Sequence, residues 1–144
     1  LAVLGRDRAD RLIDGKRDGE RLVVVGGHSL GGAMAAAWAA RAPERADGLI
    51  LMGAYPAGGD DLSAAGLPTL VLAAEHDGLA TLDEVREGLA RLPPSAGLEI
   101  VDGAVHAFFG RYGPQRGDGL PRVPRATAEA EIAGAIEAFL AGLR

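Results

Sequence analysis

The chain has 144 residues, of which 48% are hydrophobic and 24% charged, with a net charge of −5 and no cysteine. This composition is typical of one globular domain, and it excludes a disulfide framework, thiolate metal ligands and a cysteine nucleophile. The acidic balance and the 4% aromatic content argue against nucleic acid as a partner. No apolar run reaches the roughly 20 residues of a membrane-spanning helix.

The first half of the chain is predicted to alternate helices with buried strands. Residues 6–14 predict a short helix with a charged face. Residues 22–25 are apolar and mostly β-branched, which predicts a buried parallel strand that stops at Gly26 and Gly27. The small residues of 30–42 predict a helix able to lie close to a sheet, and Pro43 ends it. Two further buried strands are predicted within 49–52 and 67–73.

The second half continues this alternation. Thr81 and Glu84 form a capping box that starts a helix, which Pro93 closes. Residues 98–101 predict a fourth strand, and a last helix is predicted to start near Thr127 with the apolar stripe Ile132, Ile136, Phe139, Leu140 and Leu143. The stretch 108–125 is irregular, and a loop of this length in a compact domain is usually functional or mobile. The expected fold class is α/β, with about four parallel strands flanked by helices.

The segment after the first strand holds the motif Gly27-His28-Ser29-Leu30-Gly31. G-x-S-x-G between a strand and a helix is a nucleophile elbow, in which the serine backbone is strained and the flanking residues must lack bulk. Gly27 and Gly31 are expected to meet that steric need. The N–H of Leu30, at the start of the helix, is expected to stabilise an oxyanion. Ser29 is therefore the candidate nucleophile.

Two further candidates follow later strands. Asp77 comes after the third strand and His106 after the fourth. Because ligands gather beyond the carboxyl ends of parallel strands, Ser29, Asp77 and His106 are expected to meet above the sheet. Glu75 and Asp83 compete for the role of the acid, and the Asp77-Gly78 turn favours Asp77.

The chain resembles the α/β hydrolases, and among them the dienelactone-hydrolase-like bacterial serine hydrolases, a largely uncharacterised subset. The resemblance rests on VVVGGHSLGGAMAAAWA, GLILMGAYPAG, EHDGLAT and VHAFFGRYGPQRGDG, and it covers most of the chain. It implies Ser29 as nucleophile, His106 as general base and Asp77 as the acid. It also implies a small-molecule ester-type substrate and no metal or organic cofactor. Ala104-Val105 before His106 departs from the family pattern, in which Gly-Asn is expected.

Other kinds of site are less consistent with the residues. A phosphate loop needs Lys and then Ser or Thr after its last glycine, but Gly32-Ala33 stand there. Asp47 precedes its strand, which places it at the wrong end of the sheet for a dinucleotide site. No histidine pair has metal-binding spacing. His28 and His76 are expected to be structural neighbours of the site, whereas Trp38 and Met34 are expected in the core.

The 28 residues before Ser29 hold one predicted helix and one predicted strand. A complete sheet of this class has more strands before the nucleophile, and a second oxyanion donor comes from one of their loops. We therefore expect residues 1–144 to be a single but incomplete domain, the C-terminal half of a hydrolase, that is poorly soluble or oligomeric and nearly inactive when expressed alone.

Two functions remain open. The first is a serine hydrolase that cleaves an ester, lactone or thioester, with acyltransferase and peptidase activities as variants. The second is a non-catalytic remnant of the fold that binds a partner through its open sheet edge. The sequence leaves open the oligomeric state and whether this expected soluble domain is cytoplasmic or exported.

Overall fold

The computed structural model describes residues 22–144, so the helix predicted at 6–14 lies outside the described residues. Four strands form a parallel sheet in the order β1-β2-β3-β4. Their bounds are Val24–His28 for β1, Gly48–Met52 for β2, Thr69–Ala74 for β3 and Gly97–Val101 for β4. The four predicted parallel strands are confirmed.

The end of β1 differs from the prediction. The strand was predicted to stop at Gly26, but it continues to His28, with Gly26 paired to Ile50 and Gly27 to Leu51. A glycine keeps both backbone hydrogen-bonding groups, so it does not interrupt a ladder. At Gly26 the absence of a side chain also matters, because a Cβ there would lie 2.7 Å from the carbonyl oxygen of Ile50.

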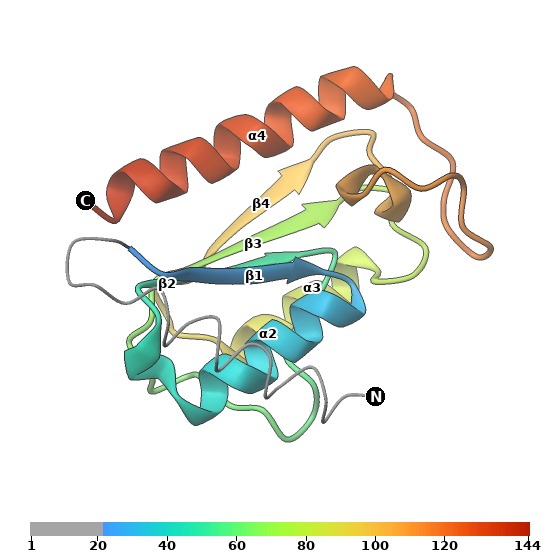
Figure 1. The fold of residues 1–144 in the computed structure, drawn as a ribbon. Coiled ribbons are helices and arrows are strands. Elements are labelled where there is room, and N and C mark those ends of the chain that lie inside the picture. The colour runs from blue at the N-terminus through green and yellow to red at the C-terminus, as the bar shows by residue number, and fades with distance from the viewer. Residues whose placement is uncertain (1–21) are drawn as a thin grey trace.

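Helices cover both faces of the sheet (Figure 1). Helices α2 (Leu30–Arg41) and α3 (Leu82–Gly88) lie on one face, and α4 (Arg125–Gly142) lies on the other. Short 3₁₀ helices are η1 (Pro43–Arg45), η2 (Leu89–Arg91) and η3 (His106–Phe109). The predicted capping box of α3 is confirmed, because Glu84 Oε2 accepts the Thr81 N–H at 2.9 Å. Helix α4 begins at Arg125, two residues before the predicted start.

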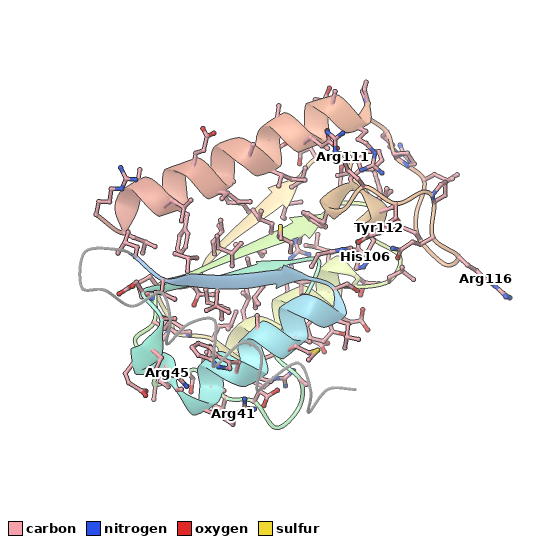
Figure 2. All side chains as sticks on the ribbon, in the orientation of Figure 1. Arg41, Arg45, His106, Arg111, Tyr112 and Arg116 are labelled. Atoms are coloured by element: carbon pink, nitrogen blue, oxygen red, sulfur yellow. The ribbon has the colours of Figure 1, made fainter. Side chains whose placement is uncertain are left out.

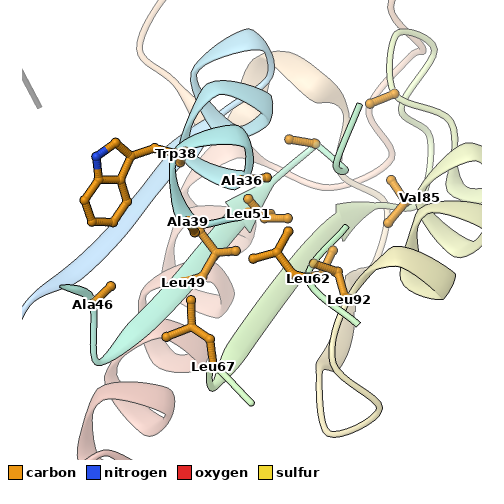
Figure 3. Packing of buried hydrophobic residues seen from close by; sticks show 14 of the residues in the cluster. Ala36, Trp38, Ala39, Ala46, Leu49, Leu51, Leu62, Leu67, Val85 and Leu92 are labelled. Carbon is orange, nitrogen blue, oxygen red and sulfur yellow. The ribbon is translucent and has the colours of Figure 1, made fainter. Parts of the chain in front are cut away.

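The core between the sheet and α2 is made of alternate strand residues and small helix residues (Figure 3). Leu49 and Leu51 of β2 face this side and are fully buried. Ala36 and Ala39 of α2 have no exposed surface, so the helix backbone lies close to the strands. Trp38 is buried, as predicted, whereas Met34 is only partly buried.

The second core lies between the sheet and α4. Ile50, Leu70 and Leu72 point to this side and contact the buried face of α4. That face is narrower than predicted: Ile132 is buried, but Leu140 and Leu143 of the predicted stripe are only half-buried. Leu143 still packs against β2, because a Cβ on Gly48 would lie 2.9 Å from its Cδ1.

The two ends of the sheet have different chemistry. At the amino end, Asp47 Oδ2 accepts the Val23 N–H at 2.7 Å. Asp47 was predicted to lie at this end of the sheet, because it precedes its strand. At the carboxyl end, Ser29, Asp77 and His106 follow β1, β3 and β4. Within 22–144, no helix combines the length and apolar character that crossing a membrane requires.

Candidate active site

Ser29 has an unusual backbone conformation. Its φ of 53° and ψ of −126° make it the only non-glycine residue with positive φ in the described part of the chain. Such a conformation costs about 1–3 kcal/mol and persists only where the surroundings impose it. The Ser29 N–H donates to Met52 O at 3.0 Å, and its carbonyl accepts the Ala33 N–H at 3.1 Å. The turn is therefore fixed between β2 and the first turn of α2.

Two glycines let β1 and α2 approach within this turn. A Cβ on Gly27 would lie 2.4 Å from the carbonyl carbon of Gly31, and a Cβ on Gly32 would lie 2.5 Å from the Cβ of Ala54. A Cβ on Gly31 would meet no atom within 4 Å. The prediction that Gly31 must lack a side chain for steric reasons is therefore wrong, as judged from the described residues. Gly32 has it instead, because it is the residue that faces the backbone of Gly27 and the end of β2.

The structure brings His106 and Asp77 into direct contact. His106 Nδ1 lies 2.7 Å from Asp77 Oδ2, and the two side chains are 1% and 0% exposed. The other oxygen, Asp77 Oδ1, accepts the N–H groups of Leu79 at 2.8 Å and Ala80 at 2.7 Å. Both carboxylate oxygens are thus occupied, which fixes the plane of the carboxylate and the orientation of the imidazole.

The second ring nitrogen of His106 has no partner. Nε2 is buried and makes no hydrogen bond within residues 22–144, so the ring is not hydrogen-bonded to Ser29. Hydrogen bonds between nucleophile and base are often unmade without substrate. A buried imidazole nitrogen that is free, opposite a nitrogen bound to a carboxylate, is placed to accept a proton.

Gly53 is a site residue that the sequence reasoning missed. It follows β2 with a φ of 50°, and a Cβ there would lie 3.0 Å from His106 Nδ1 and 3.1 Å from Asp77 Oδ2. A side chain would press on the hydrogen bond between these two residues. The signal in the sequence was a glycine directly after a buried strand, at the end of the sheet where the other candidates lie.

Comparison with known proteins identifies the family. The family model described as "Alpha/beta hydrolase family" matches residues 1–129. The chain belongs to the alpha/beta hydrolase family. No curated protein sequence matches this chain.

Solved structures with the same fold come from several sources. An alpha/beta hydrolase enzyme from the metagenome of Mar Chica lagoon sediments is 23% identical over 74% of this chain, with a TM-score of 0.60. A predicted CIB-like hydrolase from Thermoplasma acidophilum is 22% identical over 76%, with a TM-score of 0.61. The esterase domain of a Rhodothermus marinus protein is 17% identical over 88%, with a TM-score of 0.60. This chain spans 61%, 52% and 63% of their respective lengths.

His28 lies against the ring of His106. Their ring centroids are 4.4 Å apart, and the ring of Tyr112 stacks on His28 at 5.5 Å. The Tyr112 hydroxyl hydrogen-bonds the His28 ring, and Figure 2 places Tyr112 and His106 at the same end of the molecule. Burial, and next the neighbouring His106, lower the pKa of His28 below its usual 6.5. His28 therefore favours its neutral form beside the imidazole of His106.

The lowered pKa of His28 predicts a pH-dependent stability. The unfolded chain binds the proton more readily than the native state, so the free energy of unfolding should fall as the pH drops below about 6.5. Thermal unfolding at about pH 7.5 and pH 5.5 should show a smaller loss of Tm in His28→Asn than in the unchanged protein. His76→Asn, which changes a histidine paired with Glu75 instead, is the control. An equal loss in His28→Asn would contradict the prediction.

Asp118 joins the turns that carry His106 and Asp77, and it too was missed. Its carboxylate accepts the N–H groups of His106 at 3.1 Å, Ala107 at 2.9 Å, Gly119 at 2.8 Å and Gly78 at 3.3 Å. Burial alone would raise the pKa of Asp118, but these four hydrogen bonds outweigh it and hold that pKa below its usual value. The long irregular loop is thereby tied to both turns.

Removal of the Asp118 carboxylate should loosen this end of the molecule. Asp118→Ala leaves four N–H groups without their acceptor, and we expect a loss of about 1–3 kcal/mol in the free energy of unfolding. Denaturant unfolding measures the change. Asp83→Ala is the matched control, because Asp83 is 90% exposed beside Arg86 and a surface change costs within about 0.5 kcal/mol. Equal stability of the two variants would show that water accepts the four N–H groups in place of the Asp118 carboxylate.

The competing acids lie elsewhere. Glu75 Oε2 accepts the Gly103 N–H at 2.7 Å and lies 3.5 Å from His76 Nε2. Asp83 lies on the exposed side of α3. Among these three carboxylates, Asp77 is the one that contacts His106, in agreement with the choice made from the turn sequence.

Leu30 is the first residue of α2, and its side chain is 74% exposed. The first N–H groups of a helix have no intrahelical acceptor and lie at its positive end. This is the position expected of an oxyanion donor. Across residues 22–144, no cluster of three or more His, Asp or Glu side chains is arranged to hold a metal ion.

Proposed function

We propose that this member of the family is a serine hydrolase of the dienelactone-hydrolase-like kind, which cleaves a carboxylic ester, lactone or thioester through an acyl-enzyme on Ser29. The observation that carries the proposal is the buried Asp77–His106 hydrogen bond of 2.7 Å, with Nε2 of the imidazole left free. The strained conformation of Ser29 supports it, because strain of this kind gathers at functional sites. The esterase domain among the similar structures supports an ester as the substrate.

The proposed reaction has two halves. In the first, Ser29 Oγ attacks the carbonyl carbon while His106 Nε2 takes the hydroxyl proton, and Asp77 stabilises the imidazolium. The Leu30 N–H donates to the oxyanion of the tetrahedral intermediate. The intermediate collapses as His106 gives its proton to the leaving oxygen or sulfur. In the second half, His106 takes a proton from water, the hydroxide attacks the acyl-enzyme, and Ser29 recovers its proton.

An active-site probe tests this proposal. The product of the complete open reading frame that contains this sequence should react with a fluorophosphonate, and mass spectrometry should locate the label on Ser29. Ser63 and Ser95, the other serines of the chain, are exposed and serve as internal controls. A label on either of them would contradict the assignment of Ser29.

The alternative function is a binding module without catalysis. It is favoured by the place of β1 at the end of the strand order, where in the described sheet one side of the strand pairs with β2 and the other has no strand. A folded protein that neither reacts with the probe nor hydrolyses p-nitrophenyl esters would favour this alternative over the hydrolase.

A further inference from the structure

A small apolar cavity adjoins Ser29. Its volume is about 200 Å³, and its walls include Leu30 of the elbow, Ala33 of α2, Ala54 and Tyr55 after β2, and Ala80 after the Asp77 turn. No charged side chain of residues 22–144 lines it. The volume is below the roughly 300–1,000 Å³ of common ligand pockets, so the cavity suits one small part of a substrate.

The floor of the cavity is fixed by tight packing. Ala54 and Ala80 are 4% and 6% exposed. Ala54 packs against the backbone of α2 at Gly32, where even an added Cβ would lie only 2.5 Å from the Ala54 Cβ. The cavity is therefore expected to keep its depth when a substrate binds.

Another wall of the cavity is formed by Tyr55, which packs against α3. A Cβ on Gly88 would lie 2.5 Å from the Tyr55 Cβ, so α3 approaches this residue as closely as a glycine permits. Burial, and next the carboxylate of Glu84 on α3, raise the pKa of the Tyr55 hydroxyl. Tyr55 therefore stays neutral beside the cavity that it lines. On this side of the cavity, a longer substrate chain would have to displace α3.

The position of His106 decides which part of the substrate enters the cavity. The leaving oxygen must receive its proton from His106 Nε2, so the leaving group lies on the imidazole side of Ser29. Ser29 and Leu30 line the cavity and His106 does not. Gly53, which also lines it, lies beside His106 Nδ1, the ring nitrogen opposite the one that donates this proton. The acyl group stays bonded to Ser29 Oγ, with its oxyanion toward the Leu30 N–H. The cavity is thus on the acyl side of the reacting carbon.

We propose that this cavity binds the acyl group of the substrate and restricts it to a short, uncharged chain of about six carbons or fewer, since an apolar cavity of about 150 Å³ holds the six carbons of benzene. The inference rests on the proposed function, since it assumes that Ser29 forms the acyl-enzyme. An ionised acyl chain would lose its hydration against apolar walls with no cation in the described residues to pair with it.

A series of p-nitrophenyl esters with one leaving group tests the length limit in the complete reading-frame product. From acetate to butyrate, kcat/KM should rise about three- to fourfold per methylene, as each buried methylene adds binding. From butyrate to decanoate, kcat/KM should fall at least about tenfold, because the last methylenes do not fit. A rate that stays level or rises to decanoate would overturn the proposal and leave the serine hydrolase standing. No hydrolysis of any ester and no labelling of Ser29 would overturn the proposed function itself.

A charged substrate of equal length tests the apolar character. The p-nitrophenyl monoester of succinic acid has the four carbons of butyrate and one carboxylate. Its kcat/KM should be at least about tenfold below that of butyrate. Equal or faster hydrolysis of the succinate would show that a cation outside residues 22–144 serves the cavity, and it would overturn the restriction to uncharged chains.

Two variants that fill the cavity test its location. Ala33→Leu on α2 and Ala57→Leu at the exposed rim should each lower the butyrate-to-acetate ratio of kcat/KM about tenfold. Ala57→Leu keeps the test decisive if Ala33→Leu fails to fold. Ala37→Leu on the same helix and Ala64→Leu in an exposed turn are matched controls that do not line the cavity, and their ratios should not change. Ratios unchanged in all four variants would place the acyl group elsewhere.

Discussion

Replacement of Ser29 by alanine is expected to lower kcat for ester hydrolysis by about 10⁴- to 10⁶-fold, because the acyl-enzyme loses its attachment point. Fluorophosphonate labelling should disappear with it. The measurement is kcat with p-nitrophenyl butyrate, together with thermal unfolding to show that the variant is folded. Ser63→Ala and Ser95→Ala, at exposed positions, should keep the activity of the unchanged protein. Activity that survives Ser29→Ala but is lost in another serine variant would contradict the proposed nucleophile.

Ser29→Gly separates the strain from the chemistry. Glycine adopts positive φ without steric cost, so this variant should lose activity and gain about 1–3 kcal/mol in the free energy of unfolding. Ser29→Ala keeps a Cβ at φ 53° and should gain nothing comparable. Equal stability of the two variants in denaturant would mean that the turn relaxes around its residue and stores no strain.

The centre of the sheet could be predicted from the sequence because β2 and β3 are buried on both faces, whereas β1 and β4 at its two sides are only partly buried. Apolar runs such as 49–52 are readable without any knowledge of their partners, and the motif at Ser29 depends on neighbours along the chain. The end of β1 was predicted wrongly because Gly26 and Gly27 resemble a turn locally. Their pairing with β2 is set by a strand that lies more than 20 residues away.

The rest of the site depends on contacts between distant residues. Gly53 matters because of two side chains that arrive from the ends of β3 and β4. Asp118 is one acidic residue in an irregular loop, and only the folded chain brings it to the N–H groups of His106 and Gly78. Gly31 and Gly32 are adjacent in the chain, and the direction in which α2 leaves the turn decides which of them faces β1. No local pattern encodes these contacts.

The identity of the acid can be tested through the tautomer of His106. Asp77 Oδ1 accepts two backbone N–H groups, from Leu79 and Ala80, and only Oδ2 contacts the imidazole. In Asp77→Asn, the amide oxygen should occupy the position of Oδ1, because the amide nitrogen cannot accept from those two donors. The amide NH₂ would then face His106 Nδ1 and donate to it. Nδ1 would become an acceptor, so the ring proton would reside on Nε2, the atom that must take the proton of Ser29.

We therefore expect Asp77→Asn to lower kcat by about 10⁴-fold while the protein stays folded, since the wrong tautomer blocks proton transfer without disturbing the surrounding hydrogen bonds. Steady-state kinetics with p-nitrophenyl butyrate measure the loss. Glu75→Gln and Asp83→Asn are the matched controls, because each neutralises a carboxylate near Asp77 in the sequence that does not contact His106. Both controls should stay within about twofold of the unchanged protein, as surface changes usually do. Full activity in Asp77→Asn, with a large loss in one control, would assign the role of the acid to that other carboxylate and would require the loop after β3 to rearrange when substrate binds.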